Sequence, residues 1–117
     1  MSDNGEVFAS DLRLVLSTAP DSTTASRLAR TLVEERLAAC VTTLPGARST
    51  FRWEHAIEEA DEVVLLIKTT AAAAPALAAR IVELHPYAVP EVLALEPVAG
   101  VASYLAWIAS SVDAPAL

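Results

Sequence analysis

The chain has little of what several classes of protein require. It holds a single cysteine among 117 residues, which excludes an internal disulfide and is typical of a reducing compartment. Its 8 Lys and Arg residues are outnumbered by 15 Asp and Glu residues, for a net charge of -7. This balance argues against nucleic-acid binding, which needs clustered basic residues. Its three glycines lack the spacing of a phosphate-binding loop. No uninterrupted apolar run reaches the ~18 residues that a membrane-spanning helix requires.

What the chain does have is an apolar composition. Hydrophobic residues make up 54% of it and aromatic residues only 5%, so we expect a folded domain whose core is filled by Ala, Val and Leu. Residues 1–6 are acidic and polar, unlike the basic and then apolar start of a secretory signal, and this favours a cytoplasmic location. We expect a flexible lead-in over 1–10, one domain over 11–112 and a short tail over 113–117.

Hydrophobic periodicity predicts the order β-α-β-β-α-β followed by a last helix. Strands are expected at 12–18, 39–53, 63–67 and 92–98, and helices at 22–37, 70–85 and around 104–108. Pro45-Gly46 predicts a bulge or sharp bend in the second strand, and the polar stretch 54–61 is expected to be a hairpin connection or a longer loop. This order is that of the ferredoxin-like α+β fold, in which both main helices cover one face of an antiparallel sheet.

The predicted strand at 63–67 is apolar on both faces. Val63, Leu65 and Ile67 point to one side of the sheet, and Val64 and Leu66 point to the other. Because two helices on one face leave the second face uncovered, something else must shield it. The last helix shields part of it. We expect another copy of the chain to cover the remainder, which predicts an obligate oligomer.

A loop held between two prolines carries the first candidate site. The segment His85-Pro86-Tyr87-Ala88-Val89-Pro90-Glu91 presents an imidazole and a carboxylate from one semi-rigid loop, which suits a single metal cation. The alternative is that His85 simply ends the preceding helix, where its protonated form interacts favourably with the helix dipole.

Three further residues are weaker candidates. Cys40 lies in an apolar segment, where a free cysteine usually packs as a small hydrophobe. His55 lies in a polar connection and is solvated by default. Lys68 ends an apolar strand, and it either pairs with an anion or extends its ammonium into solvent. Two histidines and one cysteine fall short of the four ligands of a structural zinc in one chain, which leaves a site shared between chains open. No catalytic constellation is recognisable, so we expect no enzyme.

Six motifs follow one another along the chain. They are Leu37-Ala38-Ala39-Cys40-Val41, Pro45-Gly46, Ser49-Thr50-Phe51-Arg52-Trp53, Leu66-Ile67-Lys68-Thr69-Thr70, His85-Pro86-Tyr87 with Val89-Pro90-Glu91, and Tyr104-Leu105-Ala106-Trp107. From about Leu12 to Val112, this pattern resembles the CutA divalent-cation tolerance family. The resemblance implies a ferredoxin-like subunit in a tight homotrimer, similar in architecture to PII signalling proteins. It also implies binding of divalent metal ions, copper in particular, and no assigned catalytic activity.

The resemblance also carries individual residues over. His85 and Glu91 match positions at which metal binding is discussed in the family, and Cys40 matches the cysteine of its first motif. Five residues match positions that line clefts between subunits: Trp53, Lys68, Tyr87, Tyr104 and Trp107. Ser17 stands where some relatives have a cysteine, and Ala88 stands where a glutamate is common, so a thiolate and a carboxylate are lost. His55 replaces a common glycine and restores one ligand group.

Two functions follow from these observations. The first is a cytoplasmic homotrimeric protein for divalent-cation binding and tolerance, with Cu2+ as the favoured ion and His85 and Glu91 as ligands. Copper is favoured because it binds most tightly at nearly any nitrogen and oxygen site. The alternative is a PII-like sensor that binds an anionic small molecule in the clefts between subunits. There Lys68 would pair with the anion and a tryptophan ring would stack on the ligand.

Overall fold

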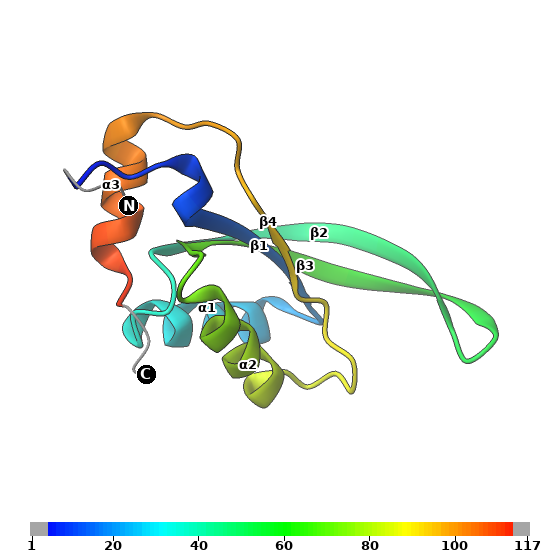
Figure 1. Ribbon diagram of the computed structural model, residues 1–117. Coiled ribbons are helices and arrows are strands. Elements are labelled where there is room, and N and C mark those ends of the chain that lie inside the picture. Colours follow the sequence, from blue (N-terminus) through cyan, green and yellow to red (C-terminus); the bar gives the residue numbers. More distant parts are fainter. Residues whose placement is uncertain (1–4, 114–117) are drawn as a thin grey trace.

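The computed structural model describes residues 5–113 of the chain (Figure 1). A short 3-10 helix, η1 (Ala9–Asp11), precedes the main elements. These are β1 (Leu12–Ala19), α1 (Ser22–Glu34), β2 (Cys40–Trp53), β3 (Ala56–Thr70), α2 (Ala74–Leu84), β4 (Leu93–Leu95) and α3 (Ala102–Ser111). The start of the expected lead-in, 1–4, and most of the expected tail, 114–117, lie outside the described residues.

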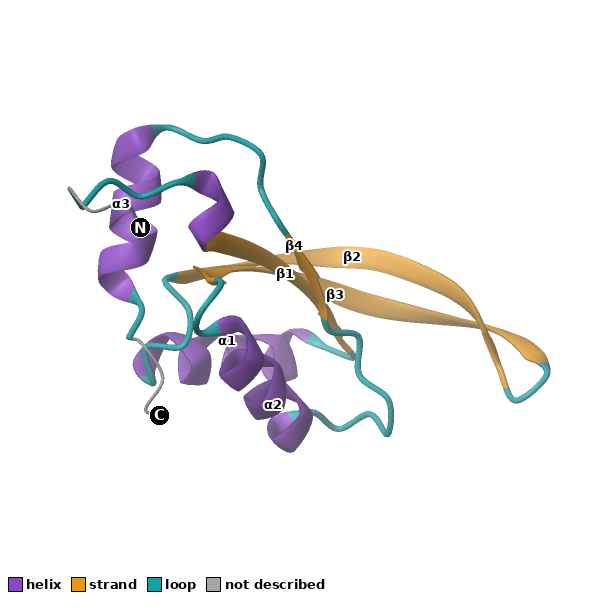
Figure 2. Ribbon diagram, in the orientation of Figure 1, coloured by secondary structure: helices purple, strands orange, loops and turns teal. Residues whose placement is uncertain are grey.

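The four strands form one antiparallel sheet in the order β2-β3-β1-β4. Helices α1 and α2 pack side by side on one face of it, and α3 lies at one end of the sheet beside η1 (Figures 1 and 2). This arrangement confirms the predicted α+β fold with an added C-terminal helix. Within residues 5–113, no helix is long and apolar enough to cross a membrane.

Local sequence signals explain where the two main helices begin. The carboxylate of Asp21 accepts a hydrogen bond of 2.7 Å from the backbone N–H of Thr24 and caps α1. That bond lowers the pKa of Asp21. Helix α2 begins at Ala74 and not near residue 70 as predicted, because Pro75 fits only the first turn of a helix. The hydroxyl of Thr70 instead accepts a hydrogen bond of 3.1 Å from the N–H of Ala73.

The prediction of a loop over 54–61 is wrong, because β3 already begins at Ala56. Beyond the register shift in β2, residues 47–53 of β2 pair with residues 56–62 of β3. Together they form a long two-stranded arm, which projects beyond the helices (Figure 1). Glu54 and His55 form the turn at its tip, and both have positive φ, 48° and 70°, as in the tight turns of twisted hairpins. The arm is polar because neither of its faces packs on the helices, so its polar sequence resembled a loop.

The predicted irregularity at Pro45-Gly46 is confirmed. The β2–β3 register shifts between Leu44 and Ala47, and Gly46 has a φ of 84°, which glycine adopts without steric cost. The last strand is shorter than the predicted 92–98. It spans only Leu93–Leu95, and Pro97 lacks the N–H needed to continue a ladder.

Two apolar clusters stabilise the fold. The larger lies between the sheet and helices α1 and α2, and its fully buried members include Val15, Leu32, Leu65, Ile67 and Leu77. The smaller lies beneath α3, where Leu105 and Ile108 pack against Leu12 of β1 and against Ala39 and Ala73. Helix α3 therefore covers one end of the sheet face opposite α1 and α2. We call the uncovered remainder of that face the open face; its members include Leu14, Leu16, Leu44, Val64, Leu66, Leu93 and Leu95.

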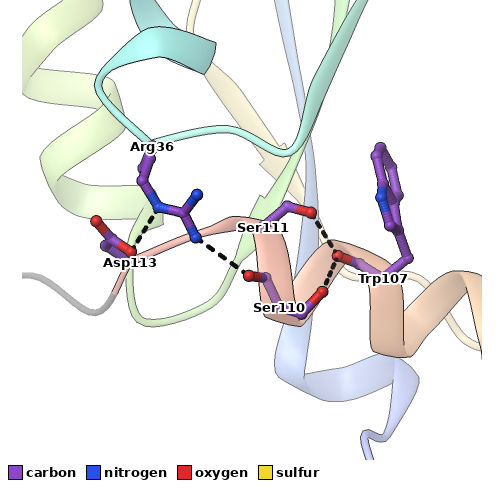
Figure 3. A network of polar contacts seen from close by, with 5 residues as sticks. All are labelled: Arg36, Trp107, Ser110, Ser111 and Asp113. Atoms are coloured by element: carbon purple, nitrogen blue, oxygen red, sulfur yellow. Dashed lines mark hydrogen bonds and ion pairs between the residues drawn. The ribbon is translucent and has the colours of Figure 1, made fainter.

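A polar network fixes the end of α3 (Figure 3). Arg36 lies in the turn between α1 and β2, and its Nε donates to Asp113 at 2.7 Å while its second terminal nitrogen donates to the carbonyl of Ser110 at 3.2 Å. The N–H of Asp113 donates in turn to the carbonyl of Arg36 at 3.0 Å. Ser110 and Ser111 both donate to the carbonyl of Trp107. The network holds the C-terminal end of α3 against the turn between α1 and β2.

Candidate functional site

A groove of about 710 Å³ lies between the arm and the loop that follows α2. Its lining comes from three parts of the chain: β1, the arm and the 87–91 loop. The lining residues are Thr18, Ser49, Thr50, Phe51, Trp53, Glu58, Ala60, Glu62, Tyr87, Ala88, Val89 and Glu91. We refer to this hollow as the arm groove.

His85 anchors the loop that forms one wall of the arm groove. Only 8% of its surface is exposed, and its Nε2 lies 2.6 Å from the carbonyl oxygen of Thr18. Its Nδ1 accepts a hydrogen bond of 3.1 Å from the backbone N–H of Tyr87. Since the carbonyl can only accept and the N–H can only donate, the ring is neutral with its proton on Nε2. Both nitrogens are therefore occupied within the chain.

Tyr87 connects this loop to the arm. Its hydroxyl donates to Oε2 of Glu62 at 2.9 Å, and its ring lies 4.7 Å from that of His85. Burial, and then the hydrogen bond to Glu62, raises the pKa of Tyr87 to about 12. The phenol therefore stays neutral and continues to donate well above neutral pH. The contacts from Thr18 through His85 and Tyr87 to Glu62 join β1, the loop and β3.

The arm groove is acidic and aromatic. Glu58, Glu62 and Glu91 line it, and no Lys, Arg or His is among the residues that line it. Arg48 lies on the other face of the arm, where it binds Glu59 at 2.7 Å and Asp61 at 2.8 Å. These two ion pairs raise the pKa of Arg48. Within the described part of the chain, the arm thus has its ion-paired charges on one face and carboxylates without a basic partner on the other.

Sequence analysis missed Glu58, Glu62 and Phe51 as site residues. Glu58 and Glu62 belong to the stretch that was expected to be mostly a loop, where alternation carries no meaning. Once β3 is extended back to Ala56, residues 58, 60 and 62 fall on one face. No local pattern marked Glu58 and Glu62, because Glu59 and Asp61 place carboxylates on the other face of the strand as well.

A second group of predicted residues lies where α3 meets the sheet. Lys68 is the only lysine of the chain, and its Nζ donates to Oγ1 of Thr42 at 2.8 Å. Its cross-strand neighbours are Leu14 and Cys40. The Sγ of Cys40 lies 3.9 Å from the hydroxyl of Tyr104, whose ring stacks on Trp107 with a centroid distance of 5.8 Å. Burial, and then the contact with Cys40, raises the pKa of Tyr104.

One chain does not bring the five predicted cleft residues together. Trp53 and Tyr87 line the arm groove, whereas Lys68, Tyr104 and Trp107 surround the beginning of β2. Trp53 lies 13 positions after Cys40 in β2, which corresponds to ~40 Å of extended strand. His55 is exposed at the tip of the arm. Among residues 5–113, no three His, Cys, Asp or Glu side chains converge as a metal site.

Comparison with known proteins decides the family. The family model described as CutA1 divalent ion tolerance protein matches residues 13–111. The chain belongs to the CutA1 family. The resemblance seen in the six motifs is therefore confirmed, and it extends over nearly the whole chain.

Relatives of known name agree with this. The divalent-cation tolerance protein CutA of Pectobacterium atrosepticum is 46% identical over 101 residues, covering 86% of this chain and 92% of that protein. The crystal structure of CutA from Xylella fastidiosa superposes with a TM-score of 0.87 at 49% identity, covering 89% of this chain and 100% of that one. The divalent cation tolerance protein of Thermus thermophilus gives a TM-score of 0.85 at 44% identity, covering 87% and 99%.

Proposed function

We propose that the chain binds divalent cations in the arm groove and serves in divalent-cation tolerance without catalysing a reaction. The observation that carries this is the lining of the groove, which has three glutamates and no basic side chain. Uncompensated carboxylates in a partly enclosed hollow attract cations. The net charge of -7 adds to that attraction from a distance. The names of the relatives, divalent-cation tolerance proteins, support the same conclusion.

Glu91 is the first ligand in this proposal, and Glu62 offers its second oxygen, Oε1. His85 becomes a ligand only if its Nδ1 exchanges the N–H of Tyr87 for the metal ion, because both ring nitrogens are occupied otherwise. Cu2+ is the favoured ion because it binds nitrogen and oxygen ligands more tightly than other first-row divalent ions do. Within residues 5–113, neither Cys40 nor His55 converges with two of these residues as a metal site.

Assembly completes the proposal. A full ligand set requires side chains from more than one chain, since no three candidate ligands converge within residues 5–113. We propose a cytoplasmic homotrimer, in which the open face provides the contact surface. His55 at the arm tip and Cys40 at the beginning of β2 are then available to a neighbouring copy.

Calorimetric titration of metal-stripped protein with Cu2+ tests the metal site. We expect saturation at one ion per chain or one per trimer. Replacing Glu91 with glutamine should weaken binding at least ~10-fold, because one charged ligand is lost. Glu59→Gln is the matched control, because it removes the same charge from a residue that does not line the groove and that binds Arg48 on the other face of the arm. Weak heat that never saturates and is equal in all variants would instead show adsorption to the acidic surface and refute the site.

A second candidate function rests on Lys68. It is the only lysine, and within residues 5–113 it has a hydroxyl partner but no carboxylate. Together with the stacked Tyr104 and Trp107, it offers a cation and aromatic faces to an anionic small molecule. This is the PII-like alternative, with the ligand held between α3 and a neighbouring copy.

Thermal unfolding in the presence of nucleotides and organic anions tests this alternative. A ligand present at 100 times its dissociation constant should stabilise the protein by about 2.7 kcal/mol. The gain should vanish in Lys68→Ala and persist in Arg27→Ala, which removes one exposed positive charge from α1. An unchanged melting temperature across the whole set of compounds counts against the sensor.

A further inference from the structure

We propose that α3 is a hinged cover over one end of the sheet face opposite α1 and α2, and that Arg36 is the catch that keeps its C-terminal end closed. The inference goes beyond the proposed metal site and does not depend on it. Three features of the molecule support it: how α3 is attached, what lies beneath it, and the backbone conformation of Arg36.

Helix α3 is attached to the sheet separately from the main core. Among the described residues, none of the members of the larger apolar cluster comes from 93–113. The helix instead contributes one stripe, Leu105, Ile108 and Val112, to the smaller cluster. Cooperative units of a protein open at different free energies. A helix held by one such stripe can therefore open while the main core stays folded.

The connection that leads to α3 is suited to act as a hinge. Residues 96–101 contain no helix or strand and join β4 to α3 as an extended loop (Figure 1). Val98 is 98% exposed, and in the described structure the one ion pair of this loop joins Glu96 to Arg13 at 3.3 Å. A loop with so few contacts opposes rotation of its backbone only weakly. Motion about it moves α3 and leaves β4 on the open face in place.

Arg36 fastens the other end of α3 (Figure 3). It lies in the turn that closes α1, with a φ of 58°, and its N–H donates back to the carbonyl of Val33 at 3.0 Å. This position favours glycine, because the left-handed conformation crowds any side chain. The arginine side chain binds Asp113 and the carbonyl of Ser110, in the last turn of α3, where carbonyls lack helical partners. The backbone strain is thus offset by contacts that a glycine could not make.

Opening of α3 would change the surface of the protein at one place. It would uncover Leu12 and Ala39, which are only 2% and 7% exposed beneath the closed helix. Because Leu12 precedes Leu14 by two residues on the same face of β1, the uncovered strip would extend the open face. Tyr104 and Trp107 belong to α3 and move with it. The position of α3 therefore sets the extent of the apolar face, and the second candidate function requires the closed helix.

Hydrogen exchange followed by mass spectrometry, on metal-stripped protein, measures the opening of α3. Peptides from α3 report on the cover, and peptides from β1 and from the buried part of β3 report on the main core. In the unmodified protein we expect the amides of α3 to exchange at least ~10-fold faster than those of the two strands. Equal exchange rates would overturn the inference, because α3 would then open only when the whole chain unfolds.

Two substitutions of Arg36 separate the catch from the strain. Arg36→Ala and Arg36→Gly both remove the side chain that binds α3, so we expect α3 to exchange about 5-fold faster in both. Only glycine also relieves the strained backbone, which stabilises the folded chain as a whole. Exchange of β1 should therefore be slower in Arg36→Gly than in Arg36→Ala. Arg30→Ala is the matched control, because it removes an equal charge from an exposed ion pair within α1.

The catch is refuted if α3 exchanges as slowly in Arg36→Gly as in the unmodified protein, or if Arg30→Ala accelerates it equally. The second outcome would show that only the loss of a positive charge matters. Because the protein is stripped of metal throughout, this test is separate from the Cu2+ titration. Failure of the metal site leaves the exchange of α3 unchanged, and uniform exchange refutes the cover without affecting the metal site.

Discussion

Replacing His85 with alanine is expected to destabilise the folded protein by about 3 kcal/mol. The substitution removes a buried ring that makes two hydrogen bonds, one to the carbonyl of Thr18 and one from the N–H of Tyr87. It leaves that carbonyl without a partner in the interior, where an unsatisfied group costs about 1 to 3 kcal/mol. It also removes the ring that packs on Tyr87. Urea unfolding at one fixed protein concentration measures the difference.

The chain supplies its own control for this experiment. His55 is the only other histidine, and it is exposed at the tip of the arm. His55→Ala should therefore change the free energy of unfolding by no more than about 0.5 kcal/mol. Equal stability of the two variants would contradict an anchoring role for His85. A comparison of His85→Ala with Glu91→Gln, a change at an exposed position, separates loss of a metal ligand from loss of the loop's anchor. Both of these variants should bind Cu2+ less well, but only His85→Ala should lower the free energy of unfolding.

The fold was largely predictable because its core elements have clear patterns. Asp21 marks the start of α1, and the continuous apolar run 63–67 marks the buried part of β3. The arm was not predictable in the same way. Its turn, Glu54-His55, adopts positive φ without the glycine or asparagine that usually marks such turns. Its strands mix aromatic and charged residues on one face, as with Phe51 opposite Glu58, so no apolar period is visible.

The site was predictable only where its residues are neighbours in sequence. His85, Tyr87 and Glu91 fall within seven residues, and the two prolines between them indicated a rigid loop. Glu58 and Glu62 reach the same groove from a different element, through strand register and the bend at Gly46, which no local pattern encodes. The orientation of the His85 ring also depends on Thr18, a residue 67 positions away. Long-range pairing therefore decides whether His85 is a free ligand or an anchor.

The open face predicts the second large effect, on assembly. Leu44, Leu93 and Leu95 lie on it with 47%, 56% and 43% of their surface exposed, and α3 covers only its other end. Apolar side chains that adjoin one another across neighbouring strands form a contiguous patch, which soluble proteins usually bury against a partner. In the proposed homotrimer, three equivalent patches are buried at once. Light scattering at micromolar concentration should then give three times the 12.3 kDa of one chain.

Replacing Leu93 with aspartate should dissociate that assembly. The side chain is exposed in a single chain, so the substitution should have little effect on folding of the subunit. In the trimer it would place an unpaired carboxylate in each contact, at a cost of at least about 3 kcal/mol per contact, which corresponds to more than 100-fold weaker association.

Val82→Asp is the matched control, because Val82 is equally exposed, at 58%, on α2 at the opposite face of the sheet. If Leu93→Asp scatters as a single chain while Val82→Asp scatters as three, the open face is the contact surface. A trimer that survives Leu93→Asp, or an unmodified protein that scatters as one chain, contradicts the proposed assembly, and a shared metal site would then have no second chain from which to take its remaining ligands.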